Sequence, residues 1–284
     1  MEKITAEILN KVVTKRPQES HKGNYGRVLL IGGSSNFGGA ILMAAEGALN
    51  AGAGLITVAT HSINNAALHA RLPEAMFVDW HDRGLGQLIK KMDVVCIGPG
   101  LGGGSTATAL MQLVADSCGP AQKVVMDASA LDLLAKNPDL LPKRAGLVVF
   151  TPHQMEWQRL SGIQIAFQDD AANQTALQQL LGTQRGVLVL KSSRTRVYFD
   201  GQVFQNTAGN PAMATGGMGD TLAGIISGFL GQFPGDLDPV LAAVYAHSKA
   251  ADILAADRYV VRPTEVSAFL PKLMKLSADK SASM

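Results

Sequence analysis

A glycine-rich stretch at residues 210–224 contains residue types that could transfer a phosphoryl group. Gly217, Met218 and Gly219 precede Asp220, and an amphipathic helical pattern follows. Backbone N–H groups at a helix N-terminus lack intrahelical partners, so they bind anions and can stabilise a phosphoryl group in transfer. A carboxylate beside them can accept the proton of a hydroxyl nucleophile. The pattern predicts Asp220 as such a base, although an acid in the first helical turn is also common for stability alone.

A second candidate is a lysine that directly follows the apolar run 187–190. A lone lysine is more often solvated than functional. Here hydroxyl groups surround it, which suits a phosphate-rich ligand. The candidate nucleotide-binding residues are Lys191, Ser192, Ser193, Arg194 and Thr195.

His153 and Glu156 are three residues apart, so one helical turn would place them on the same side and facing a common site. A capping arrangement explains the same residues, with Thr151 as the helix N-cap and Pro152 at the first helical position. Both interpretations can hold together, because a cap can also place His153 at the rim of a pocket.

Two further turns are rich in glycine. Residues 32–40 do not form a P-loop, because Gly39 and Ala40 stand where that motif needs lysine and a hydroxyl residue. This turn is either a tight turn that opens a helix or a place where the backbone approaches a ligand.

The other turn, with Gly98, Gly100 and Gly103, matches the dinucleotide pattern G-x-G-x-x-G. Asp127 ends the next strand, roughly where a ribose-binding acid belongs. A nicotinamide oxidoreductase is therefore one alternative, although Pro99 within the turn is unusual.

The elements that must position these residues alternate along the chain. Apolar, β-branched runs lie at 28–31, 55–59, 76–78, 94–97, 124–126, 147–150 and 187–190, and helical segments at 40–51, 63–72, 85–91, 106–117 and 131–135. This alternation predicts a mostly parallel sheet with helices on both faces. The glycine or polar residues that follow the runs ending at 31, 97, 126, 150 and 190 then lie at the carboxyl ends of the strands, where open sheets bind ligands.

The pattern changes after residue 190. Asp200-Gly201 between the runs 196–199 and 203–204 predicts an antiparallel hairpin, and two helices are expected at about 219–233 and 239–257. With no linker or repeat, we expect one α/β domain over residues 1–284. It would have an N-terminal segment at about 1–20 and a frayed tail at about 277–284.

Composition excludes several protein classes. Of the 284 residues, 47% are hydrophobic and 17% charged, which is enough apolar material for a large core and argues against disorder. The net charge is +2 without a basic run, so no nucleic-acid partner is expected. Two cysteines cannot build a disulfide framework. We find neither a membrane span nor a secretory leader, and expect a cytoplasmic protein.

Taken together, the motifs resemble those of a known family, the ADP-dependent NAD(P)H-hydrate dehydratases of the ribokinase-like superfamily. The resemblance extends from about His21 to about Thr264. It is carried by HKGNYG at 21–26, GGSSNFGGA at 32–40, AGAGL at 51–55, GPGLG at 98–102, TPH at 151–153 with Glu156, and GNPAMATGGMGD at 209–220.

The resemblance implies a ribokinase-like fold and a repair reaction. The substrate would be (S)-NADHX or NADPHX, in which the nicotinamide ring is hydrated at C6. ADP would phosphorylate the hydroxyl, and loss of phosphate would yield NAD(P)H, with AMP as the second product. Members of the family need Mg²⁺ and are often homotetramers. Whether ADP or ATP is the donor stays open.

The resemblance also assigns roles to residues. Asp220 would be the base, and the N–H groups of Gly217, Met218 and Gly219 the anion hole. The run from Lys191 to Thr195 would hold the adenine nucleotide together with Gly219. Glu156 would help to place Mg²⁺, directly or through water. The hydrate pocket would be lined by Ala40, Gly102, His153 and Asp220.

Two positions depart from the family pattern. Ser129 replaces the second acid of an Asp-Ala-Asp-Ala-Leu motif, of which Asp127 remains, so a metal or phosphate role for that second acid is in doubt. Ser192 follows Lys191 where the family usually has glycine, which could narrow the nucleotide site.

Three other functions remain as alternatives. A small-molecule kinase of the same fold would leave the phosphate on its product. A regulatory nucleotide-binding module would keep ADP binding after loss of Asp220. A dehydrogenase would reduce NAD and be indifferent to ADP.

Overall fold

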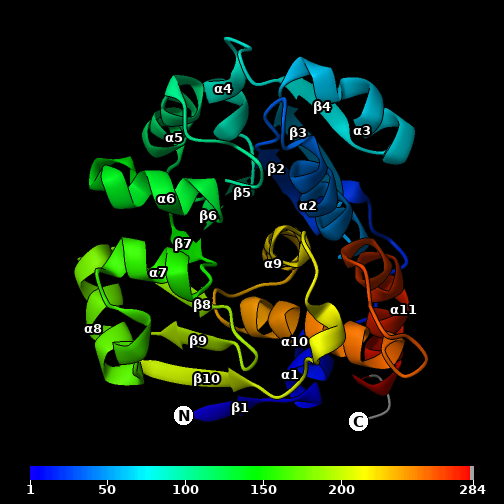
Figure 1. Cartoon of the computed structure of the whole chain (residues 1–284). Coiled ribbons are helices and arrows are strands. Elements are labelled where there is room, and N and C mark those ends of the chain that lie inside the picture. Colours follow the sequence, from blue (N-terminus) through cyan, green and yellow to red (C-terminus); the bar gives the residue numbers. More distant parts are fainter. Residues whose placement is uncertain (282–284) are drawn as a thin grey trace.

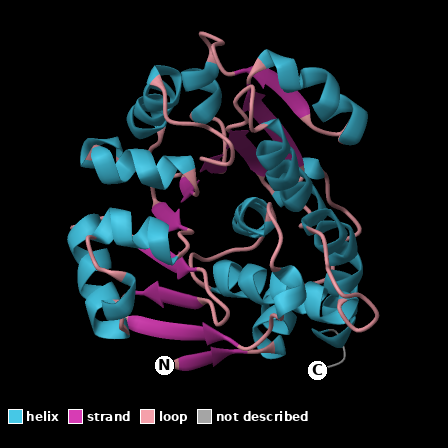
Figure 2. Cartoon of the chain, viewed as in Figure 1, coloured by secondary structure: helices cyan, strands magenta, loops and turns pink. Residues whose placement is uncertain are grey.

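The computed structural model describes residues 1–281, which form one continuous mixed sheet with helices on both faces (Figure 1, Figure 2). The strand order is β1-β10-β9-β8-β7-β6-β5-β2-β3-β4. The strands are β1 (Glu2–Ile4), β2 (Arg27–Ile31), β3 (Leu55–Thr60), β4 (Met76–Asp79), β5 (Val94–Ile97), β6 (Lys123–Met126), β7 (Leu147–Phe150), β8 (Gly186–Leu190), β9 (Arg196–Phe199) and β10 (Gln202–Asn206).

The part of the sheet from β4 to β8 is parallel throughout. Most of these strands are buried on both faces, which explains their nearly continuous apolar sequences. β9 pairs antiparallel with β8 and with β10, so the predicted hairpin at the end of the sheet is confirmed. Asp200 and Gly201 both have positive φ, as the tight turn between β9 and β10 requires.

The helices form two layers, each with its own core against one face of the sheet (Figure 1). α4 (Leu85–Ile89), α5 (Ser105–Ser117), α6 (Ser129–Lys136), α7 (Gln154–Ser161) and α8 (Asp170–Leu181) cover one face. The other face is covered by α1 (Ala6–Val12), α2 (Gly38–Asn50), α3 (Asn65–Arg71), α9 (Met218–Gln232), α10 (Asp238–Leu254) and α11 (Pro263–Ser281). Within residues 1–281, no helix combines the length and apolar character needed to cross a membrane.

Helices α2 and α9 pack unusually closely because glycines stand at their contact. A Cβ added at Gly224 would lie 1.9 Å from the carbonyl oxygen of Ala44, and one at Gly47 would lie 2.6 Å from that of Thr221. Any side chain at Gly224 would therefore push the two helices apart. This contact holds the N-terminal half of α9 against the middle of α2.

Both ends of the described chain are more ordered than the sequence predicts. The N-terminal segment contains β1 and α1, and β1 extends the sheet beside β10. The prediction of a frayed tail from residue 277 is wrong for 277–281, because α11 continues to Ser281. Ser277 and Ala278 are buried, and the hydroxyl of Ser281 donates to the carbonyl of Asn10. The rest of that predicted tail, 282–284, lies outside the described residues.

Candidate functional site

The glycine-rich turns after β2 and β5 lie against each other at the carboxyl edge of the sheet. The Gly33 N–H donates to the Pro99 carbonyl at 2.9 Å, and the Ser34 N–H donates to that of Gly100 at 2.7 Å. A Cβ at Gly100 would lie only 3.1 Å from the Cβ of Ala40. The turn that contains Gly102 therefore lies beside the first turn of α2, as the proposed substrate pocket requires.

The N-terminus of α9 packs against α2, the helix that follows the turn after β2. A Cβ at Gly217 would lie 2.3 Å from Met43 Sδ on α2. Gly217 is the N-cap residue of α9 and has φ 94° and ψ −11°, a left-handed conformation that glycine adopts without strain. No described side chain caps this helix, which leaves first-turn N–H groups available to an anion. The predicted helix start, with Asp220 in the first turn, is confirmed.

Lys191 reaches the same place from the end of β8. Its Nζ lies 2.8 Å from Asp127 Oδ1 and 4.0 Å from Glu156 Oε2. A Cβ at Gly219 would lie 2.9 Å from this Nζ, so the ammonium group is beside the N-terminus of α9. The Lys191 side chain is 19% exposed and that of Asp127 2%. An ammonium group, free N–H groups and the first-turn acid of α9 therefore gather at one edge of the sheet.

Burial and mutual charge tune the ionisable groups of this cluster. Burial, followed by the charge of Asp127, raises the pKa of Asp220 from 3.8 to about 6, although Lys191 works against this rise. For Lys191, burial alone would lower the pKa, but the neighbouring carboxylates, led by Asp127, outweigh burial and raise it. Asp220 is therefore suited to exchange a proton near neutral pH, while Lys191 keeps its positive charge.

The helix after β7 begins differently from the sequence prediction. The predicted N-cap, Thr151, is buried, and its hydroxyl donates to Asp127 Oδ1 at 2.7 Å. His153 is the N-cap of α7 instead, and its Nδ1 accepts from the Met155 and Glu156 N–H groups at 3.1 and 3.2 Å. Glu156 Oε2 in turn accepts from the His153 N–H at 2.8 Å. The cap was predicted at the wrong residue, because Thr151 is held by Asp127.

The turn after Lys191 is stabilised within itself. The hydroxyl of Thr195 donates to the Ser192 carbonyl at 3.3 Å, and the Arg194 N–H donates to Ser192 Oγ at 3.1 Å. Ser192, Ser193 and Arg194 are exposed. Hydrogen bonding joins the turns after β7 and β8, since the Lys191 N–H donates to the Pro152 carbonyl at 2.8 Å. This exposed turn therefore begins directly beside the charged cluster.

Comparison with known proteins decides the family. A family model described as NAD(P)H-hydrate dehydratase matches residues 28–272. The chain belongs to the NAD(P)H-hydrate dehydratase family.

Relatives in this family match nearly the whole chain. An ADP-dependent (S)-NAD(P)H-hydrate dehydratase from Lactiplantibacillus plantarum is 54% identical over 276 residues, which are 96% of this chain and 97% of that protein. A solved ribokinase-like superfamily protein from Enterococcus faecalis is 47% identical, with a TM-score of 0.92 and coverage of 98% and 96%. The ADP/ATP-dependent NAD(P)H-hydrate dehydratase of Bacillus subtilis, co-crystallised with ATP/Mg²⁺, is 31% identical, with a TM-score of 0.85 and coverage of 97% and 98%. The predicted ribokinase-like fold is confirmed.

The sequence left the contacts of two groups at this NAD(P)H-hydrate dehydratase site unpredicted: Asp127 was interpreted only as a possible ribose-binding acid, and His247 was not singled out. Asp127 pairs with Lys191, and its position at the end of a strand two places away in the sheet was the available signal. His247 on α10 is 5% exposed, and no partner within residues 1–281 bonds its Nε2. Burial, together with the charge of Lys191, lowers the pKa of His247 to about 4, so this imidazole stays neutral near the cluster. No sequence spacing relates α10 to β8, so only the packing shows this proximity.

Proposed function

We propose that the protein converts (S)-NADHX and NADPHX to NADH and NADPH in an ADP-dependent reaction that releases AMP and phosphate. The observation that carries this proposal is the meeting of Lys191, the uncapped N-terminus of α9 and Asp220 at one edge of the sheet. A phosphoryl group in transfer needs this combination of positive charge, N–H donors and a nearby base.

The first step is transfer of the β-phosphoryl group of ADP to the substrate. The Asp220 carboxylate takes the proton of the C6 hydroxyl, and the oxygen forms a bond to the phosphorus. The bond to the bridging oxygen breaks, and AMP leaves with that electron pair. The N–H groups of Gly217, Met218 and Gly219, with the Lys191 ammonium group, stabilise the negative oxygens during transfer.

The second step removes the new phosphate ester. Phosphate is a far better leaving group than hydroxide, and the lone pair of the ring nitrogen expels it as the C6–O bond breaks. Loss of a proton from the adjacent ring carbon then restores the reduced nicotinamide ring. The net reaction is NAD(P)HX plus ADP giving NAD(P)H, AMP and phosphate. With ATP as donor, ADP would be released instead.

The remaining predicted residues would hold the two ligands. The turn from Ser192 to Thr195 would hold the adenine nucleotide with Gly219, since it is exposed and begins beside Lys191. Ala40 and Gly102 would contact the hydrated nicotinamide, since their two turns lie side by side next to α9. The exposed imidazole of His153 would lie at the rim of this pocket.

Mg²⁺ fits this site as a companion of the nucleotide. Within residues 1–281 no group of three or more His, Cys, Asp and Glu side chains could hold a metal ion. Mg²⁺ usually keeps several waters and needs few protein carboxylates beside substrate phosphates. Glu156 would hold it through water, because its Oε2 already accepts the His153 N–H. When bound, Mg²⁺ would neutralise phosphate charge.

Three predictions extend beyond this site. We propose one ribokinase-like domain over the chain, a homotetrameric assembly and a cytoplasmic location. The continuous sheet supports the first, and the family resemblance supports the other two.

A spectrophotometric assay tests the proposed reaction. Hydrated NADH lacks the near-ultraviolet absorbance of NADH, so recovery of that absorbance follows the repair directly. The protein would be mixed with hydrated NADH and Mg²⁺, and ADP or ATP added in turn. We expect recovery only with a nucleotide, together with stoichiometric free phosphate. Phosphate that remains on the product would instead identify a kinase, and no recovery from folded, nucleotide-binding protein would refute the proposal.

A further inference from the structure

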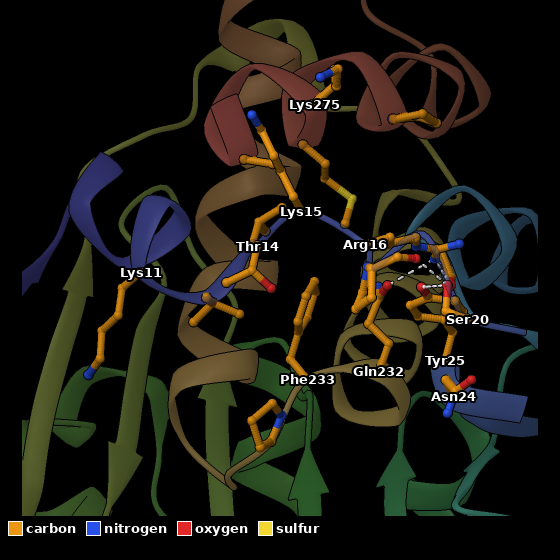
Figure 3. Close-up of a pocket in the computed structure, with 18 of the residues that line it drawn as sticks. Lys11, Thr14, Lys15, Arg16, Ser20, Asn24, Tyr25, Gln232, Phe233 and Lys275 are labelled. Atoms are coloured by element: carbon orange, nitrogen blue, oxygen red, sulfur yellow. Dashed lines mark hydrogen bonds between the residues drawn. The ribbon is translucent and has the colours of Figure 1, made fainter. Parts of the chain in front are cut away.

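A cavity of about 1040 Å³ lies at the edge of the sheet opposite the charged cluster. Figure 3 shows side chains that line it. Two of the residues that line it, Tyr25 and Gly52, come just before β2 and β3, at the amino ends of these strands. The other walls come from the segment after α1, the end of α9 and helix α11. The volume is at the upper limit of the range of small-molecule sites.

One side of this cavity is apolar. Phe233, at the end of α9, lies among the lining side chains in Figure 3. Further apolar contacts are available from Val13, Leu49, Pro271 and Met274. Such a surface would favour a ligand with an aliphatic or aromatic body, because removing apolar area from water is favourable.

The rim of the cavity is mainly basic, with four basic and two acidic side chains. Lys11 is paired with Asp238 at 2.7 Å. Lys15 and Lys275 both pair with one carboxylate, that of Asp279, at 3.6 and 2.6 Å. With Glu19, Asp238 and Asp279 counted, four basic side chains face three acidic ones, so the rim carries a small excess of positive charge.

Arg16 is held in place at this rim by neutral groups. Its Nη2 donates to the Gly52 carbonyl at 2.5 Å and to Gln232 Oε1 at 3.0 Å. The guanidinium carbon lies 3.7 Å from the centre of the Tyr25 ring. These partners fix the guanidinium without cancelling its charge. Because this side chain is already fixed in position, binding a ligand to it costs less conformational entropy of the protein.

We propose that this cavity binds a small amphipathic anion. The acidic group would lie beside Arg16 and Lys15, and the apolar body would lie against Phe233 and Met274. This site is separate from the proposed nucleotide and hydrate sites, and it does not depend on the proposed reaction.

A fluorescence titration with 1-anilinonaphthalene-8-sulfonate tests the proposal, with uncharged N-phenyl-1-naphthylamine as the comparison probe. We expect saturable binding of the sulfonate and much weaker binding of the uncharged probe. Arg16→Gln should weaken sulfonate binding about tenfold, because a hydrogen bond to a charged group contributes on that order. Thr14→Phe, which places a ring in the cavity, should abolish it. Lys91→Gln, an exposed lysine outside the cavity, is the matched control and should bind as the wild type does.

Three results would overturn the proposal. Equal binding of both probes would show an apolar groove without anion recognition. Unchanged sulfonate binding in Thr14→Phe would place the probe elsewhere. A lower Tm in Arg16→Gln with unchanged sulfonate affinity would mean that Arg16 only joins the ends of α2 and α9. If Arg16→Gln does not fold, as judged by circular dichroism, Lys15→Gln replaces it and should still weaken sulfonate binding severalfold.

Discussion

Two ion pairs in this protein have almost the same length and very different surroundings. Lys191 and Asp127 are 2.8 Å apart, with side chains 19% and 2% exposed. Arg159 and Asp132 are 2.7 Å apart and join α7 to α6, with side chains 45% and 41% exposed. The first pair lies in the cluster beside α9, and the second lies on the outer helical layer.

The difference shows that environment, and not distance, decides what an ion pair can do. Water screens an exposed pair, so such pairs stabilise proteins by about 0–1 kcal/mol. In a buried pair each charge has lost its water, so removing one partner leaves the other uncompensated, at a cost of about 3–5 kcal/mol. The buried pair also acts on a neighbour: burial, followed by the charge of Asp127, raises the pKa of Asp220, while the charge of Lys191 lowers it.

The strongest expected effect comes from Asp220→Asn. The amide cannot accept the hydroxyl proton, so kcat should fall by about two to four orders of magnitude, the usual range for loss of a general base. The measurement is turnover of hydrated NADH with ADP and Mg²⁺, with ADP affinity as the control for an intact nucleotide site. A near-normal kcat would show that Asp220 is not the general base.

Lys191→Met should give the next largest effect. We expect kcat to fall by about two to three orders of magnitude, the range for losing one donor to a developing negative charge. Stability should fall by about 3–5 kcal/mol, because Asp127 keeps its buried charge without a partner. Kinetics and urea unfolding measure the two effects separately.

The variant Lys191→Met/Asp127→Asn provides the control for that result. It should recover much of the stability, because both charges are gone, but not the activity. Recovery of both would mean that Lys191 supports only the fold.

A smaller effect should appear in the pH dependence of kcat/KM. Asp220 acts as a base only when ionised, and its pKa is raised to about 6. We therefore expect kcat/KM to be nearly constant above this pH and to fall tenfold per unit below it. Folding stability should change in the opposite sense. The pKa of Asp220 is near 3.8 in the unfolded chain and about 6 in the folded protein. The amount that Asp220 adds to the free energy of unfolding is therefore fully present below pH 3.8 and is lost as the pH rises through about 6. A profile without an inflection near 6 would contradict the assignment.

The smallest effect should come from Arg159→Gln, which removes the exposed pair. We expect a stability loss of no more than about 1 kcal/mol and unchanged kcat, because water screens both charges. Urea unfolding and the same turnover assay check this. If Arg159→Gln lost as much stability as Lys191→Met, solvent exposure would not explain the difference between the two ion pairs.

The sequence predicts the strands and turns of this fold better than its contacts. The parallel strands were identified because burial on both faces leaves continuous apolar runs, as in Val94–Ile97. The start of α9 was identified because glycines precede an acid and an apolar helical pattern. β1 was missed, since only three residues pair and two of them are exposed.

The candidate site shows the same limit. Spacing along the chain could bring Lys191 and Asp127 to one edge of a parallel sheet, because each follows a strand and strand ends meet there. It could not show which side chains would touch there, that Asp127 would both pair with Lys191 and bind Thr151, or that Asp220 on α9 would lie beside them. The cap of α7 was misplaced for this reason. The roles of the site residues stay predictions until the variants are measured.

The pairing of β1 with β10 has a consequence for how the protein is made. Glu2 lies opposite Phe204, so about 200 residues separate the two strands in the chain. On the ribosome, the residues of β1 must wait for β10, which is synthesised about 200 residues later. During that time the partner edge is absent, and once β10 forms it is open to other strands until β1 arrives. The beginning of this chain is therefore among the last parts to join the sheet, and a chaperone would act most usefully in that interval.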